Sequence, residues 1–385
     1  MELEVDGELE VDGPAISPLQ RGGVLGSMAA VGPWRLIGGK LLRQKVAMAA
    51  GAVIVLLYLV GLFAEFLAPG LPDTSRPQYT FAPPQGLSFF VDGKFQPHVA
   101  GYTVVLDKVA LRRTFVVDVN KAAPIGFFVK GPAYRLWGLF PFDRHLIGPI
   151  NPADPMYLLG ADRLGRDMLT RLIYGTRISM SIGLAGVTIS LLLGVVLGAV
   201  SGFYGGWVDT LIQRVIEVVT AMPTIPLWLG LAAAIPLTWS PLQVYFVITL
   251  IVSLLGWTSL AREVRGRFLA LRNEDFVVAA RLDGSSERRL IFRHILPSLT
   301  SHILAVVTLA VPSMIVAETS LSFLGIGLKP PVVSWGVLLQ DAQNIRAVAT
   351  APWLLVWPSL AVVTAVLALN FFGDGLRDAA DPYEH

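Results

Sequence analysis

The sequence predicts an all-α polytopic membrane protein with six transmembrane helices and a small β-containing extracytoplasmic insertion. Three observations predict this class. Of the 385 residues, 54% are hydrophobic and only 15% are charged, whereas soluble domains carry about 25% charged residues. The mean hydropathy is +0.62. Several uncharged runs also reach the roughly 20 residues that a spanning helix needs. We therefore expect these runs to cross a membrane.

The expected spans follow from the apolar runs in order. A run at 46–68 is interrupted only by Glu65, and the uncharged stretch between Arg177 and Asp209 holds the second span. The long uncharged run at 218–261 suits two crossings, because the Pro-Leu-Thr-Trp-Ser-Pro segment in its middle is typical of a turn. The fifth and sixth expected spans are 303–324 and 347–373.

Charge gives the expected orientation. The net charge is only +2, so nucleic acid is not an expected partner, and a chain without Cys has no thiolate metal site. Basic residues precede the first span and fill the segment 262–297, so we expect both regions and both termini to be cytoplasmic. Long loops are largely exempt from this rule. We therefore keep the orientation despite four arginines on the other side, Arg163, Arg166, Arg171 and Arg177.

Two segments are expected outside the membrane before the main helices. The tail 1–39 begins with Glu-Leu-Glu-Val-Asp-Gly written twice, which is typical of disorder, although a docking peptide is an alternative. The first span, 40–68, is expected to remain as an uncleaved anchor. The extracytoplasmic insertion 69–155 has strand-like pieces at 102–106, 115–119 and 126–140, the last around a Gly131-Pro132 turn. It either shields the outer mouth or contacts a partner or substrate.

The second span carries small residues at every fourth position, Gly186, Ser190, Gly194, Gly198 and Gly202. Such a seam lets another helix backbone approach closely in lipid. We therefore expect this helix to be buried in a bundle.

Two carboxylates lie near membrane depth and are candidate translocation-pathway residues. Glu217 follows Arg214 by three residues, so a local ion pair is the favoured interpretation. Glu318 has no basic partner nearby in the sequence. It is expected either near the outer mouth or in a solvated position at the membrane interface.

The segment 262–297 changes abruptly from apolar to arginine-rich. Residues 274–283 predict a short helix closed by Gly284, which permits a left-handed cap, and Ser285 or Ser286 begins a second helix ending at Pro297. The small Ala279 and Ala280 would let a partner approach closely. From the residues alone, force transmission to a partner and adhesion to membrane lipid are equal alternatives.

Several motifs give this chain a resemblance to a known family. Val278-Ala-Ala-x-x-x-Gly284 followed by Phe292-Arg-His-Ile-Leu-Pro297 resembles the EAA loop of bacterial ABC importer permeases. The stretches 159–167, 321–327 and 370–382 are similar to those of the dipeptide/oligopeptide subfamily, specifically its C-type permease. The resemblance covers about 155–382 and the first span. Val278 replaces the Glu of the loop's name, and Ala161 stands where Thr is frequent.

The resemblance implies the type I ABC importer permease fold, with a permease core at 156–385, in the bacterial inner membrane. It implies a transport subunit, not an enzyme. The implied partners are a second homologous permease of the B type, two ABC ATPase subunits of the D and F types, and an extracytoplasmic solute-binding protein. ATP and Mg would be bound by the ATPases, and no cofactor by this chain. The implied ATPase-coupling residues are Ala279, Ala280, Arg281, Asp283, Gly284, Ser285, Arg293, His294 and Pro297, and the implied motif residues before the second span are Asp162, Gly165, Arg166 and Asp167.

Other functions stay open at this point. Peptides are the expected cargo, but related permeases import nickel, opines or oligosaccharides. A proton-coupled secondary carrier would use Glu217 or Glu318 as its titrating group and would need no ATPase. An intramembrane enzyme is disfavoured, because neither Gly-x-Ser-x-Gly nor His-Glu-x-x-His occurs.

Overall fold

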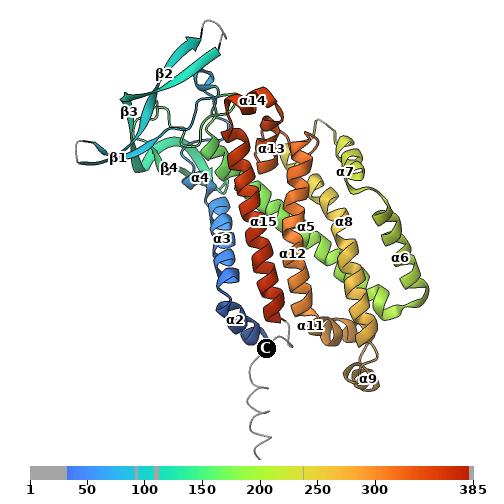
Figure 1. The fold of residues 1–385 in the computed structure, drawn as a ribbon. Coiled ribbons are helices and arrows are strands. Elements are labelled where there is room, and N and C mark those ends of the chain that lie inside the picture. The colour runs from blue at the N-terminus through green and yellow to red at the C-terminus, as the bar shows by residue number, and fades with distance from the viewer. Residues whose placement is uncertain (1–32, 92–93, 108–111, 237, 381–385) are drawn as a thin grey trace, which may run out of the picture.

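The computed structural model describes residues 33–91, 94–107, 112–236 and 238–380. Long helices form a bundle with a β-sheet at one end (Figure 1). The bundle helices are α3 (Lys45–Leu62), α5 (Met168–Tyr204), α6 (Gly206–Ala221), α7 (Thr224–Ala233), α8 (Pro241–Leu271), α12 (Thr300–Phe323) and α15 (Trp353–Ala380). The acidic repeat at 2–13 lies outside the described residues.

Shorter elements lie at the two ends of the bundle (Figure 1). At the end of the bundle where α15 ends are α2 (Pro33–Arg43), α9 (Asp275–Leu282), α10 (Glu287–Arg289), the π-helix η2 (Leu290–Ile295) and α11 (Leu296–Ser298). At the opposite end are α4 (Ala64–Leu67), the 3-10 helices η1 (Pro77–Tyr79) and η3 (Asp341–Gln343), α13 (Trp335–Gln340), α14 (Ile345–Thr350) and the sheet.

Five of the described helices are long and apolar enough to cross a membrane, and α6 with α7 makes a sixth if the pair is one span. The two helices of this pair are bent by 86°. The break falls at Met222 and Pro223, where Met222 is extended (φ −80, ψ 134) because a residue before proline avoids the helical region. The predicted hairpin turn before α8 is confirmed, and Ser240 with Gln243 forms a capping box there.

The structure agrees with the predicted number of spans better than with their predicted boundaries. The helix α5 begins at Met168 and therefore includes Arg171 and Arg177, which the prediction left outside the second span. The helix accommodates these two charged residues because each of them forms an ion pair. The first predicted span is broken at Phe63 between α3 and α4. Glu65, in α4, forms a bidentate ion pair with Arg177 of α5, with Arg177 Nη1 2.5 Å from Glu65 Oε1. This pair joins the first span to the second.

The small-residue seam on α5 packs against α8, as predicted. A Cβ on Gly198 would lie 2.5 Å from the Ala261 carbonyl oxygen, and one on Gly202 would lie 2.6 Å from the Phe268 Cβ. The Ser190 hydroxyl donates to the Ser253 carbonyl at 3.0 Å. Larger side chains at these positions would separate the two helices.

The insertion is a four-stranded antiparallel sheet in the order β1 (Leu87–Val91), β2 (Lys94–Asp107), β3 (Arg112–Leu136) and β4 (Phe140–Pro149). The expected strands are confirmed, but the predicted Gly131-Pro132 turn is wrong, because β3 runs through this pair. Proline has no N–H for the ladder, so the pair sits at a register shift between Lys130 and Tyr134 instead. The chain reverses at residues 137–139.

Candidate functional sites at the two ends of the bundle

The elbow, residues 274–298, projects from the end of the bundle that carries α2 (Figure 1). The helix α9 ends at Leu282, and Gly284 has φ +81, in the left-handed region that L side chains rarely adopt. The Ser285 N–H donates to the Ala280 carbonyl at 3.1 Å, which closes the helix end. The predicted glycine bend is confirmed.

The second half of the elbow differs from the prediction. Ser286 occupies the N-cap position of α10, but its side chain makes no capping hydrogen bond. The helix also does not end at Pro297, since the chain stays helical through η2 and α11 and leads into α12. Pro297 lies in the first turn of α11, where a missing N–H costs little. The elbow is therefore a direct extension of α12.

The two faces of α9 have different environments. Val277 and Ala280 are buried with Leu290, Ile295 and the α8 residue Phe268. The expectation that Ala280 meets a partner is therefore wrong, because its methyl group packs against the protein itself. Ala279 is exposed, as are the large side chains Phe276, Leu282 (83% exposed) and Phe292.

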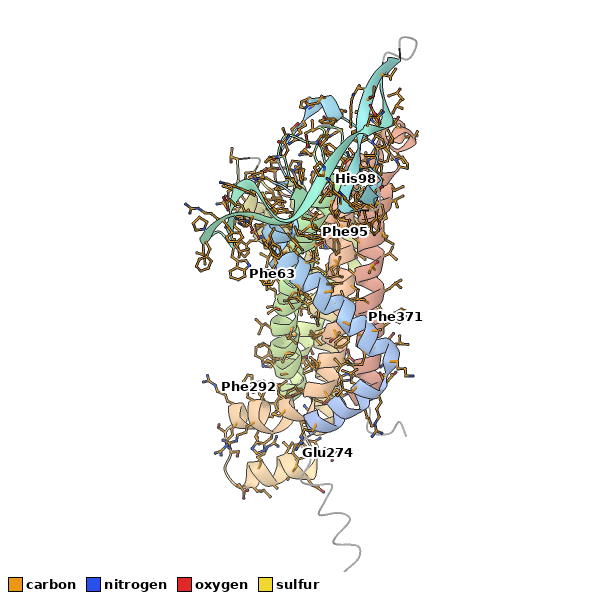
Figure 2. The ribbon with its side chains drawn as sticks, turned by 90° about the vertical axis from the view of Figure 1, so that its left-hand side faces the viewer. Phe63, Phe95, His98, Glu274, Phe292 and Phe371 are labelled. Atoms are coloured by element: carbon orange, nitrogen blue, oxygen red, sulfur yellow. The ribbon has the colours of Figure 1, made fainter. Side chains whose placement is uncertain are left out.

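The charged residues of the elbow have few partners. Arg281, Arg288, Arg289 and Arg293 are exposed and make no ion pair with any described residue. Asp283 is also exposed, and His294 and Ser285 are half-buried. Glu287 accepts a hydrogen bond from the Tyr204 hydroxyl at 2.9 Å, which ties the elbow to α5. Figure 2 shows Phe292 on η2 and Glu274 at the start of α9, where the short helices lie beyond the long ones.

The motif before α5 builds a buried arginine–aspartate cluster at the other end of the bundle. Asp162 is fully buried, and its Oδ2 lies 2.7 Å from Arg166 Nε and 2.5 Å from Arg171 Nη1. Arg171 also lies 3.5 Å from Asp341, which pairs with Arg163 at 3.0 Å. The Asp162 Oδ1 accepts the backbone N–H groups of Leu164 and Arg166, at 2.8 and 2.9 Å. The cluster joins this loop to α5 and to the end of α13.

Two further motif residues have local structural roles. Gly165 has φ +70, and a Cβ there would lie 2.0 Å from the Arg76 carbonyl oxygen, so only glycine fits. Asp167 is the N-cap of α5 and accepts from the Thr170 N–H at 2.7 Å and its hydroxyl at 2.6 Å. Burial raises the pKa of Asp167 to about 6. All four motif residues therefore support the start of α5.

Glu318 is fully buried, so the expected solvated position at the membrane interface is wrong. Its Oε1 accepts hydrogen bonds from the hydroxyls of Ser322 and Ser334, both at 2.7 Å, and its Oε2 from Ser179 at 3.4 Å. These serines come from α12, from the residue before α13, and from α5. None of the described residues forms an ion pair with Glu318. The carboxyl group connects three segments.

Glu217 is separate from both sites. It pairs with Arg214 at 2.7 Å, as the spacing predicts, and its side chain is 58% exposed. Within the described ranges, no three His, Asp or Glu side chains are grouped so that they could hold a metal ion.

Sequence reasoning missed one carboxylate of the cluster, Asp341. Asp341 is 170 residues from Arg171, and no periodicity links the two. The serines around Glu318 were missed because hydroxyls are common in membrane helices. A useful signal for the cluster is the number of arginines before α5, since buried charges require partners.

The apolar bundle, with helices long enough to cross a membrane and an exposed arginine-bearing elbow at one end, is that of a polytopic membrane protein. Two family descriptions match the sequence. Residues 194–383 match the binding-protein-dependent transport system inner membrane component, and residues 32–84 match the N-terminal TM domain of oligopeptide transport permease C. The elbow, Glu318 and the second part of the seam, from Gly194 to Gly202, fall within the first match. The sheet and the arginine–aspartate cluster lie mostly or wholly between the two.

Curated relatives agree with this match. The chain is 36% identical to the oligopeptide transport system permease protein OppC of Bacillus subtilis, over 62% of this chain and 75% of the relative. It is 30% identical to the glutathione transport system permease protein GsiD of Pectobacterium atrosepticum, over 91% of each. It is 37% identical to the dipeptide transport system permease protein DppC of Alkalihalophilus pseudofirmus, over 58% of this chain and 71% of the relative.

The chain belongs to the family of binding-protein-dependent ABC importer permeases and has their type I fold. Among solved structures, a chain of the inward-facing MetNI methionine ABC transporter covers 56% of this chain, and 98% of its own length is matched. The TM-score is 0.45 and the identity 14%. The assignment rests on the family match and the sequence relatives.

Proposed function

We propose that this chain forms half of the translocation pathway of a peptide importer and is driven by two ABC ATPase subunits that dock on the elbow. The relatives' names, which include oligopeptide, dipeptide and glutathione transport, support peptide cargo over nickel, opines or oligosaccharides. A second homologous permease supplies the other half of the pathway, and a solute-binding protein delivers the cargo. ATP and Mg are bound by the ATPases.

The orientation in this proposal puts the elbow and both termini in the cytoplasm. The elbow and the end of α15 lie at the same end of the bundle, with the sheet at the opposite end (Figure 1). The domain limits proposed from the sequence, 1–39, 40–68, 69–155 and 156–385, are kept. The ATP-driven importer is favoured over a proton-coupled carrier by the family match.

One observation carries the coupling proposal: the elbow has a fixed inner face and an open outer face. Its inner residues pack with Phe268 of α8, and its second half continues into α12. A subunit that pushes on the exposed Ala279 and Leu282 would therefore move α8 and α12 together. The unpaired elbow arginines would meet acidic groups on that subunit, where charge pairs guide association.

This movement would change access to the pathway at the far end of α12. Glu318 lies in the second half of α12 and joins that helix to α5 and to Ser334. We place Glu318 behind the side chains that line the pathway, where its hydrogen bonds connect α12, α5 and the segment at Ser334. The exposed Glu217 stays a candidate for the pathway surface.

The test is to block the outer face of the elbow without changing its inner face. Ala279→Trp should abolish co-purification of the ATPase subunits and peptide uptake, while the thermal stability of the permease stays unchanged. Ala122→Trp, at an exposed alanine of β3, is the matched control and should leave co-purification intact. Normal ATPase assembly and normal uptake with Ala279→Trp would refute docking at this face.

A second variant tests the bend itself. Gly284→Val or Gly284→Asp should uncouple ATP hydrolysis from uptake, because a side chain is strained at φ +81 although there is open space around the residue. The readout is substrate-stimulated ATPase activity in proteoliposomes that contain the whole complex. Tight coupling in both variants would show that the geometry of the bend does not matter.

A further inference from the structure

The turn between β3 and β4 exposes several large apolar side chains close together. We call residues 136–142 the hairpin tip. Leu139 is 71% exposed, and Trp137, Phe140 and Phe142 are also exposed large hydrophobic residues. Contiguous apolar surface on a protein marks a site that contacts another protein or a membrane. The hairpin tip therefore needs a partner.

The hairpin tip is fixed to the end of a membrane helix. The Trp137 indole N–H donates to the Leu62 carbonyl oxygen at 2.8 Å, and the Trp137 ring lies 5.8 Å from that of Phe63. This bond satisfies one of the carbonyl groups that a helix end leaves unpaired. Leu62 is the last residue of α3. In Figure 2, Phe63 lies at the end of α3 next to the sheet.

The length of α3 places this contact at the membrane boundary. The helix has 18 residues, and all but Ala47, Ala50 and Gly61 are at least partly exposed. At 1.5 Å per residue it extends about 27 Å, close to the roughly 30 Å hydrocarbon core of a bilayer. With Lys45 at one boundary, Leu62 lies near the other. Trp137 is then at the depth where tryptophan is enriched in membrane proteins.

Two aromatic residues that pack against this helix end have a strained backbone conformation. Trp137 has φ 54 and Phe128 has φ 53, both in the left-handed region. Bulky side chains rarely adopt this conformation, and strained residues persist where surrounding contacts fix them. The Phe128 ring lies 5.9 Å from that of Phe66 in α4. Both strained residues thus pack on the end of the first span.

The charges beside the hairpin tip suit lipid headgroups. Arg135, opposite Pro141 in the ladder, is exposed and makes no ion pair with a described residue. Arg144 is exposed as well and donates to the Phe128 carbonyl at 3.1 Å. The acid nearby, Asp143, is paired with Lys130 at 3.5 Å. Basic side chains next to aromatic ones are typical of a surface that contacts phospholipid.

We propose that the hairpin tip inserts into the interfacial layer of the bilayer beside α3, with phospholipid as its partner. The exposed surface of α3 and that of the hairpin tip meet at Leu62 and Trp137, so one lipid surface covers both. This anchor would hold the insertion at a fixed height over the bundle. The proposal is independent of the cargo and of the ATPases.

The absence of Cys in the sequence makes the test direct. The full-length Leu139→Cys chain would be labelled with a polarity-sensitive fluorophore and placed in nanodiscs of phosphatidylethanolamine and phosphatidylglycerol. Val116→Cys is the matched control, since Val116 is 51% exposed in the part of β3 that pairs with β2, away from the β3–β4 turn. Phe140→Cys provides a second label at the hairpin tip if Leu139→Cys does not fold.

We expect blue-shifted emission at the hairpin tip and quenching by nitroxide-bearing lipids that is several-fold stronger than at Val116. A water-soluble quencher should show the opposite order. Equal quenching at both sites by the lipid-borne nitroxide would overturn the proposal. It would also be overturned if the label were shielded in detergent solution only when a soluble binding protein is added, since the partner would then be a protein.

Discussion

The two ends of this molecule use arginine in opposite ways. Ahead of and within the first turns of α5, each of four arginines has a carboxylate partner; they are Arg163, Arg166, Arg171 and Arg177. On the elbow, Arg281, Arg288, Arg289 and Arg293 are exposed and make no ion pair with a described residue. At one end the charges stabilise the fold, and at the other they are available to a partner.

This difference explains a conflict in the sequence. The rule that basic residues stay inside counts every arginine alike, so the group before α5 opposed the proposed orientation. The structure shows that those arginines are largely neutralised by Asp162, Asp341 and Glu65. A charge that is paired within its own chain gives little information on orientation.

The largest expected effect tests the paired end. Arg171→Ala removes the buried partner that Asp162 and Asp341 share. Because Asp162 keeps Arg166 and Asp341 keeps Arg163, the free energy of unfolding should fall by about 3 kcal/mol, the lower end of the range for breaking a buried ion pair. Unfolding of the purified chain in detergent measures this. Arg288→Ala on the elbow is the control and should change stability by about 0.5 kcal/mol or less. Equal effects of the two substitutions would remove the contrast between the two ends.

The second-largest loss of stability is expected at Glu318, another buried polar group at the same end of the bundle. Glu318→Leu leaves the hydroxyls of Ser179, Ser322 and Ser334 without their acceptor, at about 1–3 kcal/mol for a buried group that stays unsatisfied. Glu318→Gln keeps one acceptor oxygen and should recover part of the loss. If Leu and Gln give the same unfolding midpoint, hydrogen bonding is not the role of this residue.

The base of the elbow provides a third test. Gly202→Ala would push a methyl group against Phe268, which packs with the inner face of α9, so overpacking should cost about 1–3 kcal/mol. Gly266→Ala, on the neighbouring helix α8, has open space around it and is the matched control. It should be neutral or slightly stabilising, because alanine favours a helix. A stable Gly202→Ala protein would mean that the elbow's inner face is not rigidly packed.

The smallest effect is expected for the exposed pair on α6. Glu217→Gln removes an i,i+3 ion pair with Arg214 and should change the unfolding free energy by about 0.5 kcal/mol or less. Peptide uptake should also stay close to normal if the pair is only structural. A large loss of uptake with unchanged stability would instead place Glu217 on the pathway surface.

Several features of the fold can be predicted from the sequence because each depends on residues that lie close together along the chain. The seam from Gly186 to Gly202 and the bend at Gly284 are repeats or local signals, and the structure confirms both. The bend between α6 and α7 falls at Pro223, where the sequence predicts a kink because a proline within a span leaves a backbone carbonyl unpaired. The sequence alone favours a turn at Gly131-Pro132, because proline occurs both in turns and at irregular positions in strands, and only the strand pairing distinguishes the two.

The apolar spans, the small-residue seam, the bend at Gly284 and the family can all be predicted from the spacing of residues along the chain. The packing of distant segments, in contrast, turns Ala280 inward and Ala279 outward, brings Asp341 to the cluster around Arg171 and surrounds Glu318 with three serines. The physical reason is distance along the chain. Burial and charge pairing depend on which segments pack together, and local patterns do not encode the partners of residues that lie far apart in sequence.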